Sequence, residues 1–66
     1  METYESREDY LEAILIISKR QGYCRSIDVS IELGYSKPSV SIAMKKLKDH
    51  GYILIDEKNH IILTDI

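Results

Sequence analysis

The first third of the chain arranges apolar and polar residues with the spacing of an amphipathic helix. Four apolar residues, three or four positions apart, form one side: Tyr10, Ala13, Ile14 and Ile17. Ser6, followed three residues later by Asp9, has the pattern of a helix N-cap with an acidic first turn. Gly22 is a typical stop signal. We therefore predict a helix from Arg7 to Gln21.

This helix carries more apolar surface than the core of a small domain requires. Leu11 and Leu15 widen the apolar side, and Ile16 lies on the polar side near Asp9 and Glu12. We therefore expect part of the helix to contact a partner.

A second, shorter helix is predicted to begin at Ser26 or Asp28 and to end at Leu33. Gly34 stops it, and only Gly34 and Tyr35 separate it from the next helix. A turn this short sets two helices at a steep angle, which is the geometry of a helix-turn-helix.

The third helix begins after Ser36, a residue type that favours the N-cap, and carries Pro38 in its first turn, where a missing N–H costs nothing. It is predicted to run to about His50, with Gly51 as its terminator. Its buried side is predicted to consist of Val40, Ala43, Met44 and Leu47.

Two short β-rich runs follow, Tyr52–Ile55 and Ile61–Thr64. The polar residues between them, 56–60, predict a hairpin. The order helix, helix, tight turn, helix, hairpin predicts a mainly α fold with a small β-hairpin. This is a three-helix winged helix-turn-helix that occupies residues 1–66 as one domain.

The composition fits one small domain, with 66 residues, 44% hydrophobic and 30% charged. No apolar run approaches the roughly 20 residues of a membrane span, and the amino-terminal residues do not resemble a signal peptide. The single cysteine, Cys24, cannot form an internal disulfide, as expected of a protein in the reducing cytoplasm. We interpret Cys24 as a small filler residue and not as a reactive thiol.

The net charge of −2 is unusual for a nucleic-acid binder, but it is unevenly distributed. Residues 37–50 hold four lysines and one aspartate, a net charge of +3, so the rest of the chain carries −5. The positive charge is therefore concentrated on the predicted third helix. In a helix-turn-helix, the exposed side of this helix enters the major groove.

We predict that DNA is contacted mainly by this helix and weakly by the hairpin. Hydroxyls and lysines can reach phosphates and base edges, and the amides of residues 36–39 can hold a phosphate at the helix N-terminus. Ile42 has two equally weighted interpretations: it touches a thymine methyl group, or it is buried against the domain. The candidate DNA-binding residues are Ser36, Lys37, Pro38, Ser39, Ser41, Ile42, Lys45, Lys46 and Lys58.

Two other functional classes need weighing. An enzyme is disfavoured, because His50, His60 and Cys24 show no ligand or nucleophile spacing and no glycine-rich phosphate loop exists. The serious alternative is a winged helix used for protein–protein contact without DNA or metal. The overall acidity and the apolar width of the first helix favour that alternative, whereas the lysine-rich third helix favours DNA.

The chain resembles the diphtheria-toxin-repressor and manganese-transport-regulator family of metal-dependent regulators. The most specific combination is the run Arg7–Ile14 together with Pro38-Ser39-Val40. Further matches are Gly22-Tyr23, Asp28-Val29, Leu33-Gly34-Tyr35-Ser36, Lys46-Leu47, Gly51-Tyr52-Ile53 and Leu63-Thr64. The resemblance implies a cytoplasmic bacterial repressor that binds a palindromic operator in double-stranded DNA. It also implies that the repressor acts as a homodimer loaded with Mn²⁺ or Fe²⁺.

The resemblance also implies a metal site that starts on the first helix. In the manganese-responsive branch an aspartate and, three residues on, a glutamate are ligands, and Asp9 and Glu12 match that pair. This spacing places both carboxylates on one helix face, and hard oxygen ligands suit manganese. Acidic residues near the start of a helix are also favoured by its dipole without any metal, so the spacing alone does not decide.

The remaining ligands of this family come from a helical dimerisation region after the wing, which has no counterpart in these 66 residues. We therefore expect the chain to be a fragment of a longer regulator and the metal to belong to the intact protein. Two carboxylates make a poor site, so we expect these residues alone to bind metal no better than at about millimolar concentration.

Overall fold

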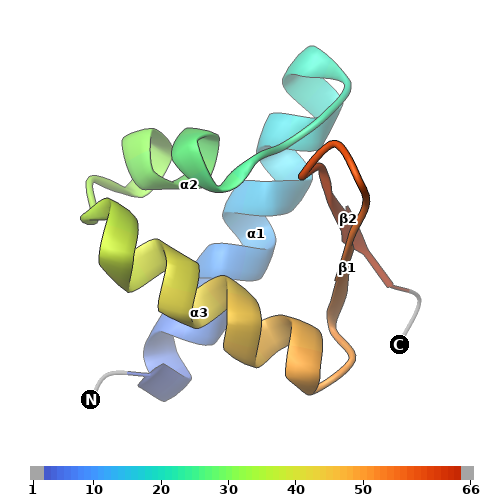
Figure 1. Ribbon diagram of the computed structural model, residues 1–66. Helices are drawn as coiled ribbons and strands as arrows, with labels where there is room; N and C mark the ends of the chain where they lie inside the picture. Colours follow the sequence, from blue (N-terminus) through green and yellow to red (C-terminus); the bar gives the residue numbers. More distant parts are fainter. Residues whose placement is uncertain (1–2, 65–66) are drawn as a thin grey trace.

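The computed structural model describes residues 3–64, with the side chains of residues 7–64. Figure 1 shows α3 crossing α1, with α2 beside the beginning of α3 and the hairpin beside its end. The predicted winged helix-turn-helix is confirmed. The elements are α1 (Thr3–Gln21), α2 (Ser26–Leu33), α3 (Lys37–Asp49), β1 (Ile53–Ile55) and β2 (Ile61–Leu63), the two strands being antiparallel.

α1 begins earlier than the sequence pattern predicted. It starts at Thr3, so Ser6 lies inside the helix and the predicted N-cap at Ser6 is wrong. An N-cap contributes only about 1 kcal/mol, so it is too weak a signal to fix the start of a helix by itself. The predicted end is confirmed. Gly22 takes a φ of 87°, and its amide donates to the Ser18 carbonyl oxygen at 2.8 Å.

The connection between α2 and α3 has the predicted tight geometry. α2 begins at Ser26, one of the two predicted starts, and Gly34 ends it with a φ of 74°, a left-handed conformation that favours glycine. The buried Ser30 side chain donates a hydrogen bond to the Tyr35 carbonyl oxygen at 2.6 Å, which ties the turn back to α2. Ser36 is the N-cap of α3, as predicted.

Backbone hydrogen bonds join the hairpin to the helical part of the chain and extend the pairing of its strands. The Ile61 amide donates to the Cys24 carbonyl oxygen at 2.6 Å, which joins β2 to the connection between α1 and α2. The Thr64 amide donates to the Tyr52 carbonyl oxygen at 3.0 Å, so pairing extends to the predicted ends of both strands. The strand register pairs Ile53 with Leu63, Leu54 with Ile62 and Ile55 with Ile61.

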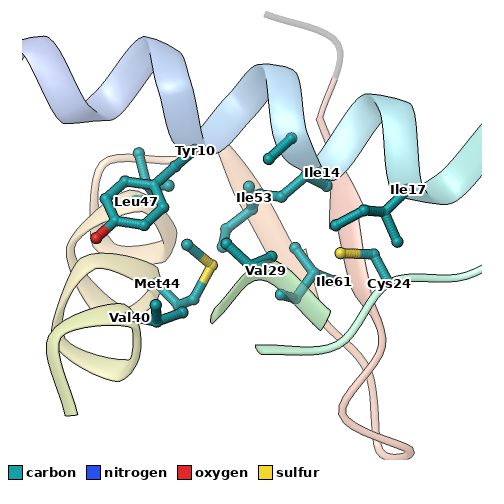
Figure 2. Packing of buried hydrophobic residues seen from close by; sticks show 11 residues of the cluster. Tyr10, Ile14, Ile17, Cys24, Val29, Val40, Met44, Leu47, Ile53 and Ile61 are labelled. Atoms are coloured by element: carbon teal, nitrogen blue, oxygen red, sulfur yellow. The ribbon is translucent and has the colours of Figure 1, made fainter. Parts of the chain in front are cut away.

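One hydrophobic core receives side chains from every element, as Figure 2 shows. The predicted inner faces of α1 and α3 are confirmed, with Ala43 only partly buried. Burial of an apolar side chain stabilises the fold by about 1.5–3 kcal/mol, so this core fixes the orientation of each helix. Its members are Tyr10, Ala13, Ile14, Ile17, Cys24, Val29, Val40, Met44, Leu47, Ile53 and Ile61.

Cys24 is part of this core and has no exposed surface. Burial, assisted by the nearby Asp28 carboxylate, raises the pKa of the Cys24 thiol to about 11. Because the thiolate is the reactive form, a thiol with a raised pKa is a poor nucleophile. These properties agree with the interpretation of Cys24 as a filler residue.

The outer side of α1 leaves two large apolar residues in solvent. Leu15 is 43% exposed and Ile16 is 44% exposed, which matches the predicted excess of apolar surface. Contact of this side with a partner stays a prediction. No helix within residues 3–64 has the length and apolar character needed to cross a bilayer.

Candidate nucleic-acid interface

The outer side of α3 faces solvent along the whole helix. Val40, Met44 and Leu47 hold the inner side in the core, and every candidate residue on the outer side is exposed. We call this set the α3 surface: Ser36, Lys37, Pro38, Ser39, Ser41, Ile42, Lys45 and Lys46.

Ile42 lies in the middle of the α3 surface and is 60% exposed. The prediction that it is buried against the domain is therefore wrong. The alternative, contact with a thymine methyl group, stays open as a prediction. An exposed isoleucine leaves most of its burial energy unused, so a partner surface that covered it would gain that energy.

The first turn of α3 offers fewer free amides than the sequence suggested. The Ser36 hydroxyl accepts from the Ser39 amide at 3.4 Å and donates to the Ser39 Oγ at 2.9 Å. Pro38 has no N–H. In the first turn, residues 37–39, only the Lys37 amide is left to meet a phosphate, so the predicted cluster of donors is reduced to one amide and the adjacent hydroxyls.

The positive charge of the α3 surface is not neutralised within the described chain. Among residues 7–64 the ion pairs are Arg20–Glu32, with 3.1 Å between Nη2 and Oε1, and, when the imidazole is protonated, His60–Asp56, with 3.9 Å between Nδ1 and Oδ2. Neither pair involves α3. Its lysines are therefore available to neutralise the phosphates of a nucleic acid.

The hairpin turn, residues 56–60, forms what we call the wing tip. The Asp56 Oδ1 accepts hydrogen bonds from the His60 amide at 2.9 Å and the Lys58 amide at 2.8 Å. These two bonds, the one from His60 first, lower the pKa of the Asp56 carboxyl. Asn59 adopts a φ of 65°, a conformation that asparagine tolerates better than most residues. The wing tip is therefore shaped by a carboxylate, and Lys58 is its only lysine or arginine.

Sequence reasoning missed a cationic cluster where α2 begins. The Arg25 guanidinium lies over the Tyr23 ring, 5.3 Å from its centroid, and its Nη2 is 3.4 Å from the His60 Nε2. The Tyr23 and His60 rings stack with their centroids 5.1 Å apart. The cluster joins the start of α2 to the wing tip and adds an exposed guanidinium in contact with His60.

One member of this cluster, Arg25, could have been noticed in the sequence. Arg25 is the only basic residue between positions 21 and 36 and directly precedes α2. Its contact with His60 spans 35 residues and has no local signature.

The predicted metal ligands Asp9 and Glu12 are both exposed on α1. Neither side chain forms an ion pair with a described residue. Within the described residues no group of three or more His, Cys, Asp or Glu side chains comes together in a way that could hold a metal ion. The pair fits the oxygen chemistry of a divalent cation, but it can supply only part of a site.

The chain matches the family model "Iron dependent repressor, N-terminal DNA binding domain" over residues 2–61. It belongs to this family. The resemblance inferred from the sequence is confirmed, and membership places the chain among the DNA-binding domains of transcriptional repressors and not among enzymes.

Several curated relatives bear the name HTH-type transcriptional regulator MntR. The protein of Bacillus pumilus is 32% identical over 62 residues, which cover 94% of this chain and 43% of the relative. That of Geobacillus thermodenitrificans is 32% identical over 59 residues, covering 89% and 42%. That of Bacillus subtilis is 31% identical over 62 residues, covering 94% and 44%. The chain thus spans less than half the length of these relatives.

Proposed function

We propose that this chain is the domain that reads operator DNA for a metal-dependent bacterial repressor. The α3 surface is the main support for this proposal. Its lysines and hydroxyls are exposed, and none of them pairs with a carboxylate of the described residues. The opposite side of α3 is buried in the core, so this surface faces solvent. In this proposal residues 1–66 are the winged helix-turn-helix domain of a longer, cytoplasmic protein.

Each residue of the α3 surface has a proposed role. The hydroxyls of Ser36, Ser39 and Ser41 contact phosphates, or bases where they reach the groove. Lys37, Lys45 and Lys46 supply positive charge, whereas Pro38 and Ile42 make apolar contacts. Lys58 adds a weak contact from the wing tip, and Arg25, whose guanidinium contacts His60 of the wing tip, extends that contact to the start of α2.

The intact repressor is proposed to bind a palindromic operator as a homodimer. Two copies of α3 then engage half-sites about one helical turn apart. Linking two modules makes the second binding event intramolecular, so the single domain binds more weakly than the dimer. Tests on this chain therefore need low salt and high protein concentration.

A salt series with duplex DNA tests the proposal. Fluorescence anisotropy of a labelled duplex of about 20 base pairs should show binding that weakens steeply between about 50 mM and 200 mM salt. The slope of log affinity against log salt counts the neutralised phosphates, at about 0.9 for each. Absence of binding at every salt concentration would contradict the proposal.

The best alternative is a winged helix that binds another protein through its apolar surface. Ile31 on α2 is 74% exposed, and Leu54 and Ile62 form an exposed cross-strand pair on the hairpin. Single exposed apolar residues are common on protein surfaces, but a group of them favours contact with another protein. This alternative predicts no rise in the anisotropy of the labelled duplex at low salt, so the same experiment separates the two functions.

The metal proposal concerns Asp9 and Glu12. In the intact repressor they would bind Mn²⁺ or Fe²⁺ together with ligands from outside these 66 residues. For this chain alone we expect calorimetric titration with Mn²⁺ to show affinity no tighter than about millimolar, as two carboxylates form an incomplete site. Micromolar affinity that is retained in Asp9→Asn would show that the cation binds elsewhere.

A further inference from the structure

A cleft of about 500 Å³ lies between the first half of α1 and the second half of α3. We call it the α1–α3 cleft. Its floor is apolar, with the buried Tyr10 and Leu47, and the Tyr52 ring closes it on the side of the hairpin. Arg7, Lys46 and His50 also line it. Among residues 7–64, no carboxylate lines the cleft, and its nitrogen side chains, those of Arg7, Lys46 and His50, suit an anion.

Arg7 is held in place at this cleft. Its Nη1 donates to the Tyr52 hydroxyl oxygen at 3.1 Å, and its guanidinium carbon lies 5.1 Å from the centroid of the Tyr52 ring. The hydrogen bond uses one of the five N–H donors of the arginine, and the other four can form further hydrogen bonds. A side chain that is already ordered loses less conformational entropy when it binds a ligand.

His50 is also oriented by a contact within the domain. Its Nδ1 lies 2.8 Å from the Lys46 carbonyl oxygen, which identifies Nδ1–H as the donor of this bond. The opposite ring nitrogen, Nε2, has no partner among the described residues. When protonated it is a second hydrogen-bond donor.

The cleft is continuous with the α3 surface, because Lys46 belongs to both. Lys46 is one turn beyond Ile42 and directly follows Lys45, so it lies at the border of the face that would enter the major groove. A phosphate contact at the cleft requires that a duplex seated on that face runs one of its two backbones along this border.

We propose that the α1–α3 cleft takes a backbone phosphate of the bound duplex, with Arg7 and Lys46 as its donors and His50 beside them. This inference rests on the proposed DNA binding and extends it to a second element, α1. The apolar floor strengthens the contact, since charge-assisted hydrogen bonds are stronger where the local dielectric is low. A phosphate contact adds affinity but reads no base.

Arg7→Gln tests the inference with the labelled duplex. We expect the salt slope to fall in magnitude by about 1, as for the loss of one phosphate contact, with affinity lowered alike for all duplex sequences. Lys19→Gln is the matched control. It removes the same charge from the exposed carboxyl-terminal end of α1 and should leave the slope within error of the unmodified chain.

Tyr52→Phe separates charge from structure. It removes the hydrogen bond to Arg7 but keeps the ring and the guanidinium, so the salt slope should stay near that of the unmodified chain. A loss of slope as large as that of Arg7→Gln would show that Arg7 acts by fixing the hairpin, and the inference would fail.

Neutral backbone linkages locate the contact on the DNA. Replacing single phosphates with methylphosphonates should identify one linkage whose neutralisation weakens the unmodified chain but not Arg7→Gln. If duplex binds and no such linkage exists, the cleft inference is wrong and the proposed function stands. If no duplex binds at all, the proposed function itself fails.

Inorganic phosphate distinguishes the duplex backbone from a free anion. Because a single phosphate lacks the contacts along α3, we expect no saturable shift of the Arg7 side-chain NMR signal when phosphate is added in the low millimolar range. Saturation there would assign the cleft to a small anion and contradict its assignment to DNA.

Discussion

α3 and the wing tip are both candidate contacts for DNA, yet they are built in opposite ways. α3 is fixed by three core residues, Val40, Met44 and Leu47, and presents lysines whose charge no described carboxylate neutralises. The wing tip has no core residue between Asp56 and His60 and is held by hydrogen bonds to a carboxylate. One region is anchored by burial and carries the charge, whereas the other is shaped by a negative charge and carries little positive charge of its own.

This difference indicates how binding should divide between the regions. A surface fixed by the core can hold side chains at the spacing of base edges, which sequence recognition requires. A turn held by hydrogen bonds is easier to displace, since exposed hydrogen bonds contribute about 1 kcal/mol or less. We therefore expect α3 to determine affinity and preference, with the wing tip as a secondary contact.

The largest expected effect tests the anchoring of α3. Met44→Ala should lower the free energy of unfolding by about 2–5 kcal/mol, because it removes a side chain that is only 2% exposed and leaves a cavity. Urea unfolding followed by helical circular dichroism measures it. Ile42→Ala, on the exposed side of the same helix, should change stability by no more than about 0.5 kcal/mol. Equal losses in the two variants would show that the sides of α3 are assigned wrongly.

The second prediction compares the charges of the two regions. Lys45→Ala should lower DNA affinity to a similar degree for all sequences and reduce the magnitude of the salt slope by about 1. Lys58→Ala should reduce that slope by less than half as much, because the carboxylates of Asp56 and Glu57 lie beside it in the chain. Anisotropy over a salt series measures both. A larger effect at Lys58 would reverse the division proposed for the two regions.

The third prediction concerns sequence preference. Ile42→Ala should change the base selected at one position of the site by roughly fivefold, which is the effect of losing about 1 kcal/mol of apolar contact with a thymine methyl group. Selection from a randomised duplex pool measures the preference. An unchanged preference would leave Ile42 as an exposed residue without a role in reading the sequence.

The smallest expected effect belongs to Asp56. Its carboxyl has a lowered pKa in the folded chain, so it stabilises the fold above the ordinary value of 3.8. This contribution is lost as the pH falls through that value and through the lower pKa of the folded state. The midpoint of urea unfolding should show this loss on acidification, and Asp56→Asn should lack it. Glu57→Gln, which changes the adjacent acid, should keep it.

Local patterns predicted the elements well wherever the deciding interaction is also local. The ends of α1 and α2 follow from Gly22 and Gly34, whose left-handed conformations suit glycine. The start of α3 follows from Ser36, whose hydroxyl meets an amide three residues away. The predicted start of α1 was wrong because an N-cap is a small energy term, and the pattern at Ser6 did not keep the helix from beginning at Thr3.

The candidate site was predictable only in part, because local patterns do not show which residues the folded chain covers. Helical spacing alone placed Lys45 on the outer side of α3, and the structure confirms its exposure. Spacing placed Ile42 on the outer side of α3, but it did not decide whether another element covers that side, because this depends on how the elements pack in the folded chain.

The order of helices, the tight turn and the concentration of positive charge on residues 37–50 were thus already present in the amino-acid sequence, since each depends on neighbours within about one helical turn. The pairing of Arg25 with His60 and that of Arg7 with Tyr52 arise only once the chain has folded. These partners are 35 and 45 residues apart, and no local periodicity links such positions. Packing of α1 and the hairpin on the shared core brings them together.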